Sequence, residues 1–350
     1  MPPEYFPWSK QTLMDCISQQ KKGNLPALDL ELTAQCSGCN CIYCDSKPEV
    51  AEVIDFEEMR WSALQRLLEE AVPLGLKWVY TCGLGEPLED GKFWNMLHFL
   101  SSHGIKLSMF SNGVFIQDIH VARELKASGV NIILKMDTFE ERQFDKILGK
   151  PGAAQKIYAA RDLLLEAGFA QGDGALTDLA FSIVPTSLSL DGIPDVVKFC
   201  EAHNIFVSIG ELEQAGAVIF NNLSEHLSIT ESHVTDLKRL SDTYYRGCYM
   251  RPICPCILTG IHIDNRGNCI VDRVTGFNCK WFLLTEPDVH VVGDIYSTSA
   301  SDLFERVKMY RANALVQNNK QIDDSFNVSY VFGGCGGNPR DIIRLAREEM

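Results

Sequence analysis

The sequence lacks any apolar run long enough to cross a lipid bilayer. Its longest apolar runs, such as 130–136, are far shorter than the roughly 20 residues that a membrane-spanning helix needs. The N-terminus also lacks the charged start, apolar middle and small-residue cleavage site of a secretory signal. With 46% hydrophobic and 22% charged residues, the composition is that of a soluble globular protein. We therefore expect a cytoplasmic protein with no membrane partner.

Positive charge is also scarce. The formal net charge of −14 argues against a partner held through its phosphates, which makes nucleic acid a poor candidate. A local basic cleft would still be compatible with this total. No low-complexity tract and no internal repeat beyond a strand-helix rhythm interrupts the chain.

Cysteine, in contrast, is abundant. The chain has 13 cysteines, and without an export signal they do not indicate a disulfide framework, because the cytosol keeps thiols reduced. They indicate metal ions, iron-sulfur clusters or catalysis instead. Cys16 and Cys200 lie among apolar residues of expected helices, so we interpret these two as small core residues.

Strands and helices alternate through the first two thirds of the chain. Apolar and polar residues alternate from Ala27 onward, which predicts a strand. A length of 350 residues permits one α/β barrel with an appendage, or two domains. The repeating unit predicts a parallel sheet, either doubly wound or closed into a complete or partial barrel. The expected strands are 27–33, 77–82, 105–110, 131–136, 179–184 and 205–210, and the expected helices are 55–68, 93–102, 116–127, 153–166, 193–202, 230–244 and 300–311.

The unusual residues follow the strands. Four cysteines follow the first strand, residues 83–87 follow the second, 111–113 the third, and Asp137 the fourth. Ligands of parallel α/β folds bind at the carboxyl ends of strands. We therefore expect these segments to converge on one site. Two simpler interpretations stay open: Glu86 as a solvated turn carboxylate, and Asp137 as the cap of a helix near Thr138.

The four cysteines occupy nine residues, 36–44. Structural zinc takes four ligands, whereas a four-iron cluster held by three cysteines keeps one iron open. Cys36, Cys41 and Cys44 fit such a tripod, and Cys39 is left over. Cys39 in place of Cys41 remains the alternative second ligand.

The segment 31–44 resembles the radical S-adenosylmethionine (SAM) superfamily. Glu31, Thr33 and the three cysteines match its motif, with four residues instead of three between Cys36 and Cys41. The resemblance covers roughly 28–216 and implies a partial (β/α)6 barrel with a SAM-binding 4Fe-4S cluster. The family's SAM-binding positions correspond to Tyr43, Gly83, Gly85, Glu86, Pro87, Ser111, Asn112 and Asp137, with Lys135 where the family usually has serine.

The C-terminal cysteines resemble the auxiliary iron-sulfur domains, called twitch or SPASM, that some members carry. The segment 256–267 is similar to the hairpin that opens such a domain, although Asp272 stands where a cysteine is usual. The resemblance implies one auxiliary 4Fe-4S cluster. It also divides the chain into an N-terminal helical extension (1–26), the barrel (27–216) and a small irregular domain (217–350), whose candidate ligands are Cys254, Cys256, Cys269, Cys279 and Cys335.

Two further side chains need an interpretation. Cys248 lies at the expected junction between the domains and is a candidate donor of a hydrogen atom to a substrate radical. A cluster ligand or a buried structural thiol are equally open interpretations of it. His262, in the expected hairpin, we interpret as structural.

As the resemblance implies, the protein would cleave SAM reductively and take a hydrogen atom from its substrate. The layout is similar to aminocyclitol dehydrogenases and sugar epimerases, so we expect oxidation or epimerisation of a small sugar-like molecule, with flavodoxin or ferredoxin as electron donor. The alternative within the superfamily is maturation of a ribosomally made peptide. Only about 27 residues precede the first strand, too few for a leader-binding domain, which makes this second choice. A non-catalytic zinc or iron-sulfur scaffold is the alternative of another class.

Overall fold

The fold is built on one nine-stranded sheet. The computed structural model describes residues 4–5, 7, 9–44, 58–81, 84–171, 176–210, 212, 216–244, 260–272 and 289–317. The strand order is β11-β10-β9-β2-β3-β4-β5-β7-β8, and all neighbours from β9 to β8 pair in parallel. A separate two-stranded sheet pairs β1 (Glu4–Tyr5) with β6 (Leu176–Thr177).

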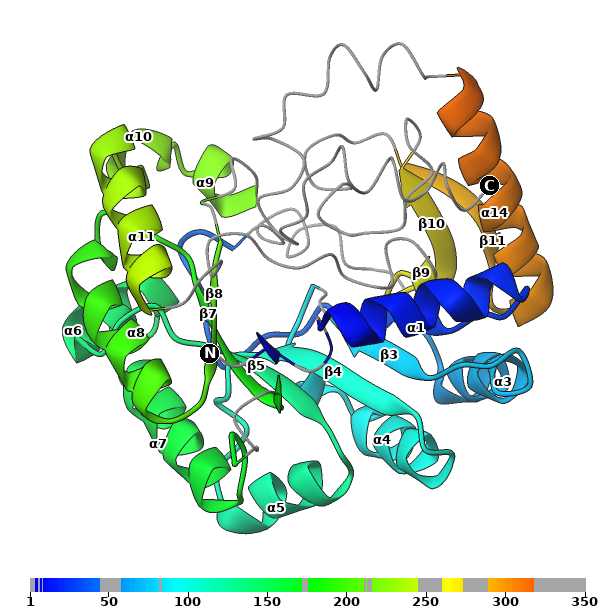
Figure 1. The fold of residues 1–350 in the computed structure, drawn as a ribbon, viewed down its shortest axis with the longest axis horizontal. Coiled ribbons are helices and arrows are strands. Elements are labelled where there is room, and N and C mark those ends of the chain that lie inside the picture. Colours follow the sequence, from blue (N-terminus) through cyan, green and yellow to red (C-terminus); the bar gives the residue numbers. More distant parts are fainter. Residues whose placement is uncertain are drawn as a thin grey trace.

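All six expected strands are present, in the expected order. They are β2 (Ala27–Leu30), β3 (Trp78–Thr81), β4 (Lys106–Ser111), β5 (Asn131–Lys135), β7 (Leu179–Ile183) and β8 (Phe206–Ile209). Helices α3 to α8 lie along the outer side of the curved sheet (Figure 1). The predicted mixed α/β fold with a parallel sheet is thus confirmed.

The helices of the barrel are α3 (Trp61–Ala71), α4 (Phe93–Ser102), α5 (Ile119–Ala127), α6 (Glu141–Leu148), α7 (Ala153–Glu166) and α8 (Ile193–Ala202). Helix α5 begins three residues later than expected because Asp118 caps it, accepting hydrogen bonds from two backbone N–H groups. Helix α6 corresponds to the helix near Thr138 that was left open as an alternative, but it begins at Glu141. The remaining helices are α1 (Lys10–Lys21), α9 (Gly216–Phe220), α10 (Ser224–Leu227), α11 (Glu231–Tyr244) and α14 (Ala300–Gln317).

The two faces of the sheet differ in chemistry. Leu28 and Leu30 belong to the large apolar core, together with the buried side of α3. Full burial of each such leucine contributes about 1.5–3 kcal/mol. Asp29 and Glu31 alternate with these leucines and are also buried, so they lie on the opposite, inner face. The inner face of β2 is therefore polar at the end of the strand, just before the cysteines.

The C-terminal hairpin extends the same sheet. Strand β9 (Gly260–Ile263) pairs in parallel with β2 and antiparallel with β10 (Asn268–Asp272), which in turn pairs with β11 (Val289–Asp294). The hairpin turns at Gly267, whose φ of 91° favours glycine. The resemblance predicts a hairpin at this place in the sequence; the division into domains stays a prediction.

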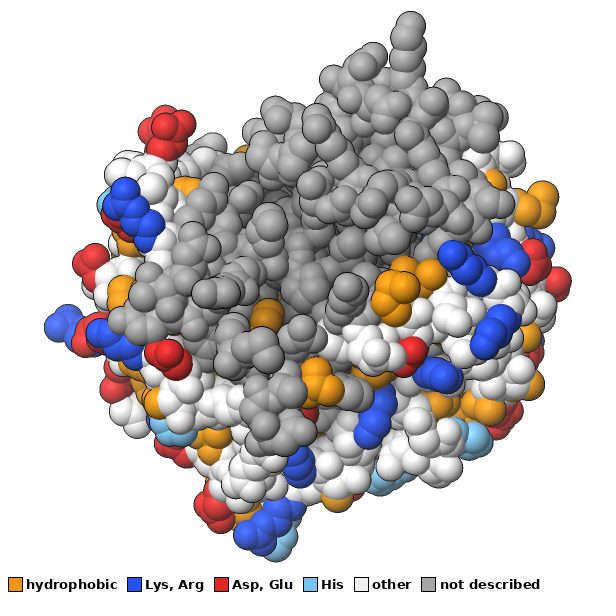
Figure 2. Space-filling model, viewed as in Figure 1, with side chains coloured by type: hydrophobic (Ala, Val, Ile, Leu, Met, Phe, Trp, Pro, Cys, Tyr) orange, Lys and Arg blue, Asp and Glu red, His pale blue; other side chains and the backbone are white. Residues whose placement is uncertain are grey.

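The described surface is mixed in charge. On the face in Figure 2, lysine and arginine side chains are interspersed with acidic ones around the rim. Among the described residues, no helix is long and apolar enough to cross a membrane.

Candidate active site

The loop after β2 carries four cysteines in two environments. Cys36, Cys41 and Cys44 are half-buried, whereas Cys39 is 3% exposed and packs in the apolar core. A hydrogen bond with the Cys41 thiol, together with burial, raises the pKa of Cys39 far above its usual range. Its burial in the apolar core sets Cys39 apart from the other three cysteines of the loop. In the described part of the chain, no three His, Cys, Asp or Glu side chains are arranged to hold a single metal ion.

Helix α6 supports the cysteine loop from one side. Backbone N–H groups of Asn40 and Ile42 donate to the carbonyls of Leu148 and Ile147 at 2.8 and 2.9 Å. These carbonyls belong to the last turn of α6 and have no partner within the helix. Gly149 ends the helix with φ of 61°, and a Cβ there would lie 2.1 Å from the Asn40 carbonyl oxygen. Helix α6 thus positions the loop. Its signal in the sequence is the apolar spacing of Phe144, Ile147 and Leu148 before a glycine.

The turn after β3 packs against the loop from the other side. The backbone N–H of Glu86 donates to the Gln35 carbonyl at 2.8 Å. A Cβ on Gly85 would lie 2.3 Å from the Gln35 oxygen and 2.6 Å from the Thr33 oxygen. Only glycine permits this approach without movement of the backbone. Pro87 begins a short 3-10 turn, Pro87–Glu89; Gly83 lies outside the described residues.

Glu86 is buried at the centre of the site. Its carboxylate accepts hydrogen bonds from Ser111 Oγ at 2.8 Å and from the Asn112 N–H at 2.7 Å. Burial raises its pKa to about 7, against the lowering effect of these bonds. Asn112 Nδ2 in turn contacts Cys36 Sγ at 3.5 Å. The interpretation of Glu86 as a solvated turn carboxylate is wrong, because its side chain joins the ends of β3 and β4.

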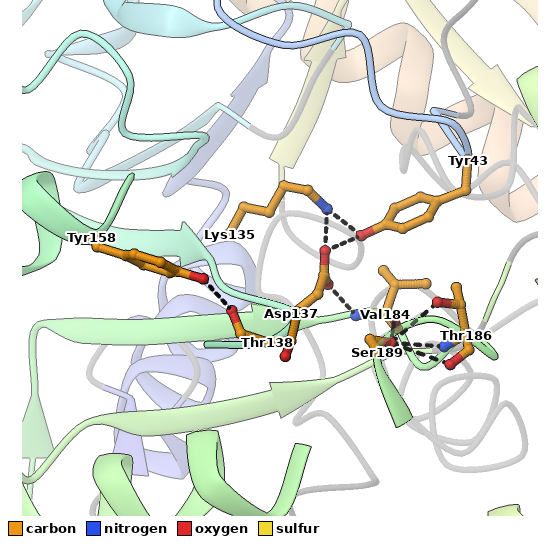
Figure 3. A network of polar contacts seen from close by, with 8 residues as sticks. All are labelled: Tyr43, Lys135, Asp137, Thr138, Tyr158, Val184, Thr186 and Ser189. Atoms are coloured by element: carbon orange, nitrogen blue, oxygen red, sulfur yellow. Dashed lines mark hydrogen bonds and ion pairs between the residues drawn. The ribbon is translucent and has the colours of Figure 1, made fainter. Parts of the chain in front are cut away.

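Asp137 forms a second buried network, shown in Figure 3. One carboxylate oxygen accepts from the Val184 N–H at 2.8 Å, and the other from Tyr43 Oη at 2.6 Å and Lys135 Nζ at 2.7 Å. Lys135 also donates to Tyr43 Oη, and its ammonium lies 4.2 Å from the centre of the tyrosine ring. The helix-cap interpretation of Asp137 is wrong: the next helix begins at Glu141, and Asp137 instead ties the cysteine loop to β5 and the end of β7.

The charges of this network explain its protonation. Burial and the nearby Asp137 carboxylate raise the pKa of Tyr43 well above its usual range, so the phenol keeps its proton and donates a hydrogen bond to Asp137. Burial alone would lower the pKa of Lys135, but Asp137 and Cys41 raise it. Lys135 is therefore a cation next to the cysteine loop.

Sequence reasoning missed side chains that position the loop, among them Glu58 and Glu89, which accepts from the Ser37 N–H at 2.7 Å. Glu58 accepts hydrogen bonds from Thr33 Oγ1 at 2.8 Å and from the Ala34 N–H at 3.0 Å. Glu58 and Thr33 are 25 positions apart, so no short sequence pattern predicts their contact.

The C-terminal candidates are only partly described. Cys269 is fully buried in β10, within the apolar core, and burial raises its thiol pKa above the usual range. These are the surroundings of an inert thiol, so its role as a ligand stays a prediction. Cys248, Cys254, Cys256, Cys279 and Cys335 lie outside the described residues. Cys16 and Cys200 are buried core residues, as predicted.

Comparison with curated proteins gives distant relatives, and no protein-family model matches the chain. The mycofactocin maturase MftC of Mycolicibacterium smegmatis is 25% identical over 190 residues, 54% of this chain and 45% of the maturase. The AdoMet-dependent heme synthase of Methanosarcina barkeri is 24% identical over 140 residues, 40% of this chain and 39% of the synthase. The chain thus spans less than half the length of these relatives.

Solved structures cover more of the chain. Streptococcus suis SuiB bound to its precursor peptide SuiA has a TM-score of 0.54 at 16% identity, covering 84% of this chain and 68% of that one. The structure of anSMEcpe with bound AdoMet has a TM-score of 0.57 at 16% identity, covering 93% of this chain and 96% of that one. At such identities the similarity establishes the fold. The relatives and structural neighbours are radical SAM enzymes, in agreement with the motifs in the sequence.

Proposed function

We propose that this chain is a radical SAM enzyme that modifies a peptide. When bound, a 4Fe-4S cluster would supply one electron to SAM, giving methionine and a 5′-deoxyadenosyl radical that takes a hydrogen atom from the substrate. The observation that carries the proposal is the convergence of three strand ends on the cysteine loop, through Gly85, through Asn112 and through Asp137. The protein's part is to bind, orient and exclude water.

The donor set fits such a cluster. Three half-buried thiols, Cys36, Cys41 and Cys44, would hold it, while Cys39 is buried in the apolar core. The buried Glu86 carboxylate suits the ammonium group of SAM, beside the backbone of Gly85 and Pro87 and the side chains of Ser111 and Asn112. Tyr43 and Asp137 supply polar groups on the opposite side of the loop.

The finer assignments belong to the same proposal. The C-terminal cysteines would hold one auxiliary 4Fe-4S cluster, Cys248 would be a hydrogen-atom donor, and flavodoxin or ferredoxin would supply the electron. These assignments rest on the resemblance of 256–267 to an auxiliary-domain hairpin, and on the hairpin that β9 and β10 form there.

Peptide modification takes precedence over the sugar-like substrate that the sequence favours. One curated relative is named as a maturase, and SuiB was solved with a precursor peptide. The names of these two proteins do not refer to a sugar or an aminocyclitol. Peptide modification therefore replaces the oxidation or epimerisation of a carbinol carbon as the proposed reaction.

Metal analysis and a deuterium-transfer assay test the proposal. After anaerobic reconstitution, iron and labile sulfide should be present, and dithionite with SAM should give 5′-deoxyadenosine. A perdeuterated extract of cells that carry this chain is then separated into a peptide fraction and a small-molecule fraction. We expect deuterium in 5′-deoxyadenosine with the peptide fraction. Deuterium with the small-molecule fraction alone would restore the sugar-like substrate, and zinc without iron or sulfide would refute the enzyme.

Glu86 predicts a pH dependence of SAM binding. With a pKa of about 7, the carboxyl is protonated below that pH and becomes the anion that binds an ammonium group above it. The ionised fraction rises from about one tenth at pH 6 to about nine tenths at pH 8, so Glu86 should strengthen the apparent affinity about tenfold over this range. Equilibrium dialysis with SAM measures it.

Glu86→Gln is the control for this profile. SAM's own titration is common to both proteins, so the difference between their profiles reports Glu86. The variant should bind SAM weakly at every pH and lack the tenfold rise. Parallel profiles for the two proteins would contradict the assigned role of Glu86.

A further inference from the structure

Three charged side chains are buried where β9 joins β2. His262 Nδ1 lies 2.9 Å from Asp29 Oδ2, and His262 Nε2 lies 3.6 Å from Glu31 Oε1. Asp29 and His262 are 0% exposed and Glu31 is 6% exposed. Burial alone would lower the pKa of His262, but Asp29 and then Glu31 raise it to about 10. His262 is therefore a buried cation between two carboxylates at neutral pH.

The two contacts of this cation differ. The Asp29 contact has hydrogen-bond geometry, and Asp29 and His262 stand opposite each other in the parallel ladder. In the described part of the chain Nε2 has no hydrogen-bond partner, so Glu31 interacts with the imidazolium mainly through charge. A buried cation that leaves one donor unbonded loses hydration. Packing alone gives no reason for a histidine here.

The position of these three residues links the hairpin to the cysteine loop. Strand β2 runs directly into the loop, and the Glu31 N–H donates to the Ile263 carbonyl of β9 at 2.9 Å. Cys36 is five residues beyond Glu31, so their Cα atoms are at most about 18 Å apart. Charges buried in protein are screened little by salt. The net charge of Asp29, Glu31 and His262 therefore changes the electrostatic potential at a group that the cysteine loop binds.

We propose that His262 is a positioning residue for the cluster site. Its positive charge offsets one of the two carboxylates, Asp29 and Glu31, that precede the cysteine loop, and so raises the electron affinity of the cluster. The C-terminal hairpin would thereby set the reduction potential of a cluster held by the N-terminal loop. This inference rests on the proposed function. It assigns to His262 an electrostatic role beyond the structural one that the sequence indicates.

The charge balance gives distinct expectations for three variants. Two carboxylates and one imidazolium sum to −1 in the wild type. His262→Gln leaves −2 and should lower the midpoint potential of the cluster. The double variant Asp29→Asn/His262→Gln returns to −1 and should restore the potential toward the wild-type value. Glu31→Gln leaves the tight Asp29–His262 pair, sums to 0 and should raise the potential.

The measurement is an anaerobic redox titration followed by electron paramagnetic resonance. The signal followed is the one that changes when SAM is added, which separates this cluster from an auxiliary one. A pH of 8.5 lies below the pKa of about 10 for His262 and well above the usual range for carboxyl groups. His98→Gln is the matched control, because His98 pairs with Glu124 at 2.9 Å on the surface, with its side chain 60% exposed. This control should keep the wild-type potential.

Each outcome decides the matter. The inference is supported if the midpoint potential is highest in Glu31→Gln, lowest in His262→Gln, and intermediate and similar in the wild type and the double variant. The same potential in all of them overturns it, even where stability falls. If His262→Gln does not fold, the upward shift of Glu31→Gln and the unshifted double variant carry the test. A wild-type protein that takes up no iron-sulfur cluster overturns the proposed function first, and this inference with it.

Discussion

Replacing Cys41 with alanine is expected to abolish 5′-deoxyadenosine formation, whereas replacing Cys39 should leave it near the wild-type level. Cys41 is one of three half-buried thiols of the loop, and a four-iron cluster that loses one of three protein ligands cannot be held in place. Cys39 packs in the apolar core and is 3% exposed. Its substitution should lower the free energy of unfolding by about 1 kcal/mol. The measurements are iron content and product yield after reconstitution.

Cys200→Ala is the matched control for Cys39→Ala. Cys200 is a fully buried thiol of α8, remote in sequence from the loop. The two variants should show similar small losses of stability and unchanged iron content. If activity is lost with Cys39 and kept with Cys41, Cys39 is the second ligand and the longer spacing between Cys36 and Cys41 has no role in ligation.

The sequence predicts the barrel well because the signals of its elements are local. Alternation at Leu28, Asp29 and Leu30 places both faces of β2 correctly. Helices α4, α7 and α8 have the predicted bounds. Helix α6 was anticipated only as a possible helix near Thr138, without bounds, because it is only eight residues long. Such a short helix depends on packing against the cysteine loop more than on its own propensity.

The site itself was only partly predictable. Strand-end position correctly brought Glu86 and Asn112 together and placed both Asn112 and Asp137 against the cysteine loop. The partners of these residues depend on strand order and register, which short-range patterns do not contain. Tyr43 and Asp137 are 94 positions apart, and His262 and Asp29 are 233 positions apart. Both the burial of Cys39 and the ion pair of His262 follow from such distant contacts.

Replacing Gly85 with alanine is expected to reduce SAM cleavage by about 100-fold or more. A Cβ at this position would lie 2.3 Å from the Gln35 carbonyl oxygen and 2.6 Å from that of Thr33. Both obstacles are backbone atoms, so relief requires the cysteine loop to move away from the turn after β3. The same shift would break the Glu86 N–H bond to Gln35. Misplacement of reacting groups by about 1 Å can cost a factor of this size.

Gly91→Ala separates this steric effect from a general cost of replacing glycine in a turn. No atom lies within 4 Å of a Cβ built on Gly91, so this variant should keep wild-type activity and stability. Iron content and SAM affinity should fall in Gly85→Ala alone, since loop and turn share the displaced backbone. Wild-type iron content with weakened SAM binding would locate the damage at Glu86. Wild-type iron content and wild-type SAM affinity in Gly85→Ala would show that the loop can move without loss of function. This result would contradict the requirement for a close backbone approach at Gly85.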